Sequence, residues 1–138
     1  MGSADPATPK RSPAPLWLWV PRLIAAGVMA FVAYLKLTDN PGDVAIFTQL
    51  GMEPHGRYLV GVIEGFCALV LISPYAPVGA VLTSGVMLGA LIGHATKLGF
   101  IVNDDGGMHV GLLALVLVSS LLVAYRRRRE LPLIGDTL

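Results

Sequence analysis

A single carboxylic acid, Glu64, lies inside an apolar run of the sequence. Residues 59–73 contain no other acidic or basic side chain, and the run is long enough to enter a bilayer. A carboxylate that faces acyl chains at the centre of a membrane helix costs about 2.5–3.5 kcal/mol on insertion scales. Its side chain is too short to reach the membrane surface across two helical turns. We therefore expect Glu64 to face protein, water or a ligand, and either to pair with a cation or to stay protonated.

Three other polar side chains lie near the ends of separate apolar runs, on the same side of the membrane as Glu64. They are Lys36, His94 and His109. Lys36 is the first candidate partner for the acid, and His94 is the second. Ionisable groups that four helices bring to the outer half of a bundle predict a pocket for a small molecule. Glu64, Lys36, His94 and His109 are therefore the candidate ligand-binding residues, and no catalytic residue is assigned.

Each of these partners also has a purely structural alternative. Lys36 could extend along the helix so that its ammonium group reaches the membrane surface. The two histidines could simply mark helix ends at the interface. Glu64 has no comparable alternative, because its short side chain cannot leave the apolar region.

The elements that must position these residues are four long apolar segments. Of the 138 residues, 54% are hydrophobic and only 14% are charged, and the mean hydropathy is +0.69. A soluble domain usually carries about 25% charge. The candidate spans are residues 16–37, 58–73, 77–94 and 108–125. The sequence predicts an all-α fold, a transmembrane antiparallel four-helix bundle over residues 16–125.

The connections between the spans carry turn and capping signals. Residues 73–77 form a tight turn that makes the second and third spans antiparallel neighbours. In the first loop, Asn40 followed by Pro41 begins a helix and Gly51 ends it, which predicts a short amphipathic helix in the first outer loop. In the third loop, residues 103–107 have the composition of a turn, and we expect no metal site there.

Glycines recur at helical spacing in the second and third spans. They are Gly61 and Gly65 in the second span and Gly85, Gly89 and Gly93 in the third. Small residues at this spacing let helix backbones approach closely in lipid. Because the tight turn makes these two spans neighbours, we expect the two glycine rows to pack against each other.

Basic residues gather toward both ends of the chain and predict its orientation. Residues 1–15 form a proline-rich tail that we expect to be disordered, and Lys10 and Arg11 precede the first span. The last span is followed by Arg126, Arg127, Arg128 and Arg129. The positive-inside rule then places both termini, including the basic tail of residues 126–138, in the cytoplasm beneath a cell (inner) membrane. The arginine run could also hold anionic lipid, and Arg22 is expected to extend to cytoplasmic phosphates.

The sequence also excludes several kinds of chemistry. Cys67 is the only cysteine, so this chain cannot form an internal disulfide or carry its own dithiol relay. The Gly-x-Gly-x-x-Gly pattern of dinucleotide-binding loops does not occur. The net charge is +1, and we expect no nucleic-acid partner. The lipid bilayer is the expected environment, and a homo-oligomer is a candidate assembly.

Several motifs occur together along the chain. Arg22 and Lys36 share a face of the first span, the first loop contains residues 47–51, and the later spans contain residues 59–65 and 86–90. In this combination they resemble the DoxX family of small four-span membrane proteins, and the resemblance covers residues 21–125. It implies association with membrane oxidoreductase assemblies. Some members resemble subunits of thiosulfate:quinone oxidoreductase, some act with extracytoplasmic redox enzymes, and distant animal relatives resemble receptor-assembly chaperones.

We therefore expect a DoxX-like membrane subunit or scaffold of a redox-associated complex, not catalytic on its own. A quinone or a lipid is the candidate ligand of the polar pocket, quinone is the candidate cofactor, and an extracytoplasmic or membrane redox protein is the candidate partner. One alternative is a small proton-coupled transporter that uses Glu64 and acts as an oligomer. Another is a membrane oxidoreductase subunit of the thiosulfate:quinone type.

Overall fold

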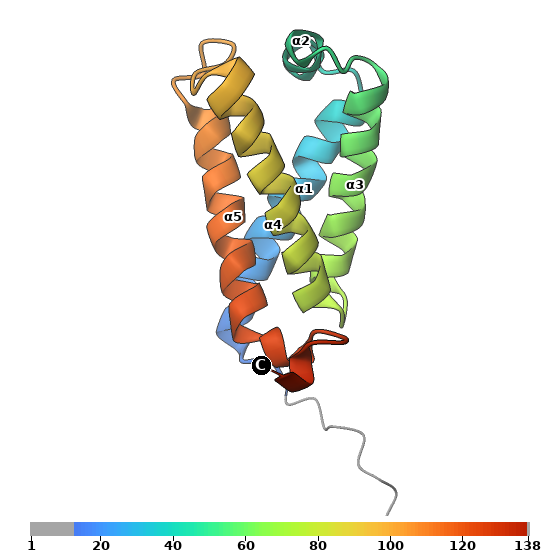
Figure 1. The fold of residues 1–138 in the computed structure, drawn as a ribbon, viewed down its shortest axis with the longest axis vertical. Coiled ribbons are helices and arrows are strands. Elements are labelled where there is room, and N and C mark those ends of the chain that lie inside the picture. The colour runs from blue at the N-terminus through green and yellow to red at the C-terminus, as the bar shows by residue number, and fades with distance from the viewer. Residues whose placement is uncertain (1–12, 138) are drawn as a thin grey trace, which may run out of the picture.

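The computed structural model describes residues 13–137 of the chain (Figure 1). Residues 1–12 and Leu138 lie outside the described part. The disordered tail expected for residues 1–15 falls almost wholly there, as do Lys10 and Arg11, so these expectations stay predictions.

Four long helices run side by side along the molecule in alternating directions (Figure 1). They are α1 (Trp19–Leu37), α3 (His55–Ile72), α4 (Ala76–Gly93) and α5 (Met108–Arg126). The turn η1 (Leu16–Leu18) precedes α1, and the π-helical turn η2 (His94–Leu98) continues α4. With these turns included, each of the four helices is long and apolar enough to cross a bilayer. The predicted all-α fold with four candidate spans is confirmed, although α3 begins before residue 58.

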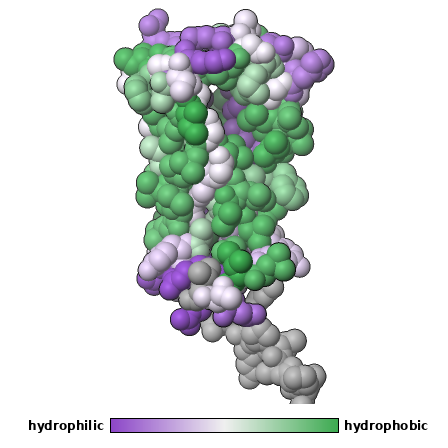
Figure 2. Space-filling model, viewed as in Figure 1, coloured by the Kyte–Doolittle hydropathy of each residue, from purple (hydrophilic) through white to green (hydrophobic). Residues whose placement is uncertain are grey.

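Exposed apolar side chains lie on all four long helices, and on the face shown in Figure 2 they lie between two polar ends. On α3, for example, Leu59, Phe66 and Leu69 are 60%, 57% and 65% exposed. An apolar belt of this kind is unfavourable in water and matches the acyl chains of a bilayer. The protein is therefore a multi-pass membrane protein.

A short helix, α2 (Pro41–Leu50), lies across one end of the bundle (Figure 1). The Asn40 side chain accepts hydrogen bonds from the backbone N–H groups of Gly42 and Asp43, at 3.0 and 3.4 Å. These are N-cap contacts, which satisfy donors that have no partner within the helix. Gly51 ends the helix with φ of 74°, a left-handed conformation that favours glycine. The short helix predicted between Asn40 and Gly51 is confirmed.

The bundle is built from two closely packed helix pairs. The most extensive contacts join α1 to α3 and α4 to α5. The buried apolar core where these pairs meet includes Ala25 and Met29 of α1, Leu71 of α3, Met87 of α4 and Val116 of α5. Small and unbranched side chains dominate this list, so the helices approach closely through van der Waals contact, which drives association in lipid.

The two glycine rows do not meet, so that packing prediction was wrong. A Cβ atom added at Gly61 would lie 3.1 Å from Lys36 Cβ, and therefore this face of α3 packs against α1. Cβ atoms added at Gly85 and Gly89 of α4 would meet no other part of the described chain within 4 Å. Gly85 and Gly89 therefore border open space rather than α3, and a Cβ atom added at Gly93 would lie 3.8 Å from Leu50 of α2.

The geometry of the turn between α3 and α4 explains why the two glycine rows do not meet. The two helices are in close contact near this turn, where a Cβ atom added at Gly79 would lie 2.8 Å from the backbone nitrogen of Leu71. From there the helices diverge toward the end that α2 covers (Figure 1). A short connection joins the near ends of two helices, but side-chain packing sets the angle at which they cross.

Arg22 does not extend to the membrane surface as expected. It is 4% exposed and donates hydrogen bonds to the carbonyl oxygens of Leu71, at 2.9 Å, and Ser73, at 3.0 Å. Its guanidinium carbon lies 3.9 Å from the centre of the Trp19 ring. The last carbonyl groups of a helix lack partners within that helix. Arg22 supplies donors for those at the end of α3, and so it joins α1 to α3.

We predict opposite effects for the same substitution at two glycines of α4. Gly79→Ala should lower the free energy of unfolding, because the added methyl group would press against the backbone of α3. Gly89→Ala should raise it by up to about 1 kcal/mol, because alanine is the better helix former and the space around it is open. Unfolding in mixed detergent micelles, followed by circular dichroism, measures both. A similar loss of stability at both positions would contradict the packing described here.

Candidate functional site

An ion pair lies inside the bundle where α1 meets α3. Lys36 Nζ is 3.1 Å from Glu64 Oε2 and 3.6 Å from Asp43 Oδ1. Lys36, Asp43 and Glu64 are 6%, 7% and 3% exposed. The structure thus contains the predicted pair of Glu64 with Lys36, and α2 adds a second carboxyl group to it.

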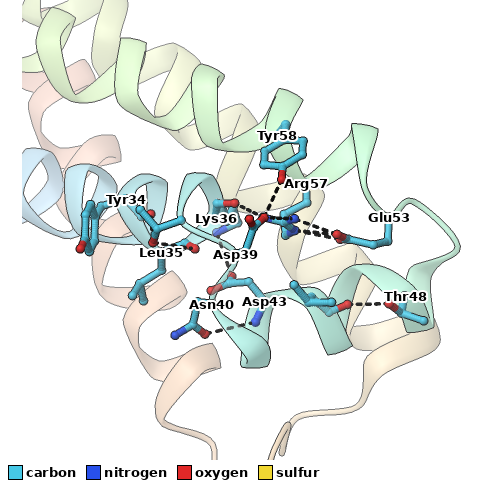
Figure 3. Close-up of polar contacts among 12 residues, drawn as sticks. Tyr34, Leu35, Lys36, Asp39, Asn40, Asp43, Thr48, Glu53, Arg57 and Tyr58 are labelled. Atoms are coloured by element: carbon cyan, nitrogen blue, oxygen red, sulfur yellow. Dashed lines mark hydrogen bonds and ion pairs between the residues drawn. The ribbon is translucent and has the colours of Figure 1, made fainter.

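Local structure explains how these three side chains meet. Gly61 lies one turn before Glu64 on α3, and its missing side chain lets the backbone of Lys36 approach. The Asn40 cap orients the first turn of α2, so that Asp43 points toward Lys36 (Figure 3).

Asp43 was missed as a site residue, because the sequence showed it only as part of a helix start. One signal could have found it. Asp43 lies three and four residues before Ile46 and Phe47, so the three share one face of α2. All three are buried. The position of Asp43 on the apolar face of the loop helix could therefore have predicted that its side chain is buried.

Oε2 of Glu64 is buried, yet it accepts no hydrogen bond from the described residues. Lys36 Nζ lies 3.1 Å from this atom and forms an ion pair with it. A carboxylate oxygen can accept from more than one donor. This atom is therefore suited to accept a hydrogen bond from a bound molecule.

A second polar network joins the end of α1 to the start of α3 (Figure 3). The guanidinium group of Arg57, which is 2% exposed, donates to the backbone oxygen of Lys36 and to Asp39 Oδ1, the latter at 2.7 Å. It also donates to both carboxylate oxygens of Glu53, at 2.8 and 3.0 Å. The Tyr58 hydroxyl donates to Asp39 Oδ1 at 2.6 Å. Arg57 was not among the predicted site residues.

The charge on Asp39 is stabilised by these contacts. The hydrogen bond from the Tyr58 hydroxyl, followed by that from Arg57, holds the pKa of the Asp39 carboxyl below its usual range. The network therefore stays charged and connected at neutral pH. It fixes the backbone from which Lys36 projects into the bundle.

His94 and His109 lie together at the α2 end of the bundle, with ring centres 5.2 Å apart. His94 is 2% exposed, and its Nδ1 lies 2.8 Å from the carbonyl oxygen of Gly99. Because a carbonyl oxygen can only accept, Nδ1 carries the hydrogen, and Nε2 of the neutral ring is an acceptor.

Asp105 caps the start of α5 and orients His109. Its Oδ2 accepts the backbone N–H of His109 at 2.7 Å, and its Oδ1 accepts those of Gly107 and Val102 at 2.8 and 3.2 Å. These hydrogen bonds, that from His109 foremost, hold the pKa of the Asp105 carboxyl below its usual range. The predicted turn in the third loop is thus a capping turn. Within residues 13–137, no three His, Cys, Asp or Glu side chains are grouped so that they could hold a metal ion.

All four candidate ligand-binding residues line one cavity. Its volume is about 300 Å³. Its polar lining consists of Lys36, Asp43, Glu64, His94 and His109. The remaining wall is apolar and includes Phe47 of α2, Ile63 of α3 and Gly89 of α4. A small apolar cavity with a few convergent polar groups is typical of a ligand site.

The C-terminal arginines lie at the opposite end of the molecule (Figure 1). Arg126 and Arg128 lie over aromatic rings, with guanidinium carbons 5.0 and 4.6 Å from the ring centres. Arg127 pairs with Glu130, and Arg129 is exposed. None of these residues lines the cavity, and their roles in topology or lipid binding stay predictions.

The sequence matches the model of the DoxX-like family over residues 20–124. The chain belongs to the DoxX-like family. The resemblance inferred from the sequence is thereby confirmed, and the DoxX-like region includes every residue that lines the cavity. No curated protein and no solved structure gives a significant match to the chain. Family membership supports a four-span membrane protein, but the ligand has to be argued from the site itself.

We predict that the two partners of the ion pair differ in their effect on stability. Lys36→Met would leave two carboxyl groups buried without a cation, and we expect the free energy of unfolding to fall by about 3–5 kcal/mol. Glu64→Gln keeps the shape of the side chain and leaves Lys36 beside Asp43, so the expected loss is smaller, about 1–2 kcal/mol.

Denaturant unfolding in detergent measures both variants. The exposed Lys97 provides a matched control, because Lys97→Met should change the free energy of unfolding by no more than about 0.5 kcal/mol. Equal stability of the wild type and all three variants would show that the pair is not buried as described.

Proposed function

We propose that this protein is a non-catalytic membrane subunit that holds the headgroup of a quinone in the cavity and presents it to a redox partner. The observation that carries the proposal is the cavity itself. It combines a buried ammonium donor, a buried carboxyl oxygen that can accept a further hydrogen bond and two histidines within an otherwise apolar wall. Such a site offers both donors and acceptors to a small ring.

The charges that line the cavity favour a ligand whose headgroup is uncharged. Lys36 provides one positive charge, and Asp43 and Glu64 provide two carboxyl groups. A phosphate group would add negative charge to a site where carboxyl groups already outnumber the cation, and like charges in a low-dielectric site repel strongly. A quinone adds no charge, and therefore it fits this site better than a phospholipid headgroup does.

The polar groups match both redox forms of a quinone. Lys36 donates to a quinone carbonyl oxygen, and Glu64 Oε2 accepts from a hydroxyl group of the reduced quinol. His94 Nε2, an acceptor in the neutral ring, offers a second position for such a hydroxyl group. The cavity residues bind and orient the ring, and we assign electron transfer to a partner protein at the membrane or its outer surface.

Binding of a short-chain ubiquinone to the purified protein tests this proposal. We expect saturable binding by the wild type and an increase in Kd of at least tenfold for Lys36→Met and Glu64→Gln, because each removes one of the two main polar contacts. Lys97→Met should bind as the wild type does. Absence of saturable binding, or equal Kd values for all four proteins, would refute the proposed ligand.

We also propose that both ends of the chain lie in the cytoplasm. In support, both ends of the described chain lie at the same end of the bundle, beside the arginine run 126–129 (Figure 1). Trp17 and Trp19 are half-exposed at that end, as in the aromatic belt of a membrane protein. The opposite end carries the acidic side chains Asp39, Glu53 and Asp104. By the positive-inside rule, these features support a position of α2 and the cavity in the outer half of the membrane.

Reporter fusions test this orientation. A green fluorescent protein joined after Leu138 should fluoresce, and alkaline phosphatase at the same position should be inactive. Alkaline phosphatase inserted in the loop at residues 103–107 should be active. The reverse pattern would place the cavity in the inner half.

A further inference from the structure

We propose that the ligand enters the cavity sideways, from the acyl-chain region of the bilayer, and keeps its tail between α3 and α4. The ligand class is then a long-chain isoprenoid quinone rather than a water-soluble ring. This inference rests on the proposed function, and it adds the route of entry and the nature of the tail. We call the opening between α3 and α4 that Ile63 and Gly89 border the α3–α4 gap.

The packing of the helices leaves this gap open. Near the connecting turn, α3 and α4 touch closely at Gly79, and farther along they diverge (Figure 1). At Gly89 an added Cβ atom would meet no other part of the described chain within 4 Å. The two helices therefore close one end of their interface and leave the other end free.

The cavity reaches the outside of the bundle through the α3–α4 gap. Ile63 and Gly89 lie on opposite sides of the gap, and both line the cavity. Both are also exposed, Ile63 by 38%. Figure 2 shows hydrophilic side chains in a recess below the polar end of the bundle, with apolar side chains on both sides. The opening thus lies within the apolar belt that contacts acyl chains.

A buried polar atom, Glu64 Oε2, lies at the inner end of the gap and could bind a polar group of the ligand. Glu64 follows Ile63 directly on α3, and its buried Oε2 accepts no hydrogen bond within residues 13–137. Glu64 lines the same cavity and is 3% exposed. A molecule that enters through the gap therefore meets a carboxyl oxygen that can accept a further hydrogen bond, together with the ammonium group of Lys36.

The roof of the cavity is held in place from the polar end. Phe47 and Ile46 of α2 are buried over the cavity. Gln49 Nε2 donates to the carbonyl oxygen of Lys97 at 3.2 Å, and Asn103 Nδ2 donates to that of Gly42 at 3.4 Å. Both ends of α2 are thus bonded to the η2 region or the third loop. Entry past α2 would have to break these hydrogen bonds, whereas the α3–α4 gap is bordered by exposed residues that line the cavity.

The size of the cavity determines how much of the ligand it holds. Its volume of about 300 Å³ is at the lower end of the range for ligand pockets. A substituted quinone ring fits such a space, but a long isoprenoid chain does not. The chain must leave the cavity, and the α3–α4 gap lets it remain in an apolar environment. A tail that stays in this apolar environment avoids contact with water, and therefore a long-chain quinone suits the gap.

A reversible block of the gap tests this inference. The double variant Ile63→Cys/Gly89→Cys, in full-length protein in nanodiscs, is cross-linked across the gap with a bifunctional thiol reagent that contains a disulfide. The native Cys67 is 1% exposed and should not react. Two probes with the same ring are compared, ubiquinone without a tail and ubiquinone with a two-isoprene tail. The matched control is Gly111→Trp, at an exposed glycine of α5 that does not line the cavity.

We expect the wild type to bind the tailed quinone at least tenfold more tightly than the tailless ring. Cross-linking should slow association of the tailed quinone at least tenfold, and cleavage of the cross-link, followed by removal of the reductant, should restore the rate. Gly111→Trp should associate within twofold of the wild type. If cross-linked and cleaved protein bind the tailed quinone at the same rate, or if the wild type binds both probes equally well, entry through the gap is wrong and the proposed function stands. If the wild type binds neither probe saturably, the proposed function itself fails.

Discussion

The carboxyl group of Glu64 lies inside the membrane region, where a charge needs a partner of opposite sign. The ammonium group of Lys36 is that partner. Separating either charge from its partner in a medium of low dielectric constant would cost several kcal/mol. The pair therefore ties α1 to α3 at the depth of Glu64, where Gly61 permits close approach. Replacing a buried ion pair by apolar side chains of similar volume is often neutral or stabilising. Retention of both charges is consequently better explained by binding than by stability.

The same type of contact holds α1 and α3 together at both ends. At one end Arg22 of α1 donates to the carbonyl oxygens that end α3, and at the other Arg57 of α3 donates to the carbonyl oxygen of Lys36 near the end of α1. Each arginine satisfies acceptors that a helix terminus leaves without partners. With α1 and α3 joined as one unit and α4 and α5 as another, the two units can diverge on one side. The cavity occupies the space that this divergence leaves.

Membership of the DoxX-like family accounts for the four membrane helices. The nature of a ligand has to be inferred from the polar groups of the cavity. The cavity combines one cation, two carboxyl groups and two imidazoles in an apolar wall. This combination favours an uncharged ring with polar substituents over a phosphate group. Its roof of α2 and its opening in the apolar belt both suit a molecule that is dissolved in the membrane. A partner at the outer surface would meet such a molecule beneath α2.

Much of the architecture could be predicted from the sequence, because it depends on local or obligatory effects. Spans follow from hydropathy, and the bounds of α2 follow from Asn40 and Gly51, whose side-chain and backbone chemistry act within a few residues. The pairing of Glu64 with Lys36 was predictable for another reason. A lone acid in hydrocarbon must find a cation, and few cations lay within reach.

Tertiary structure alone decided which faces of the helices meet. Asp43 as a second carboxyl group at the site, Arg57 as a link to the backbone of Lys36, and Arg22 as a cap for α3 all depend on contacts between helices. Gly61 and Gly65 of α3 face α1, and Gly85 and Gly89 of α4 face open space, although the short turn suggested that the two rows would meet. The rotation of each helix about its axis and the angle between neighbours result from packing over the whole bundle. No short segment of sequence contains that information, since it depends on how the side chains of all four helices pack together in one core.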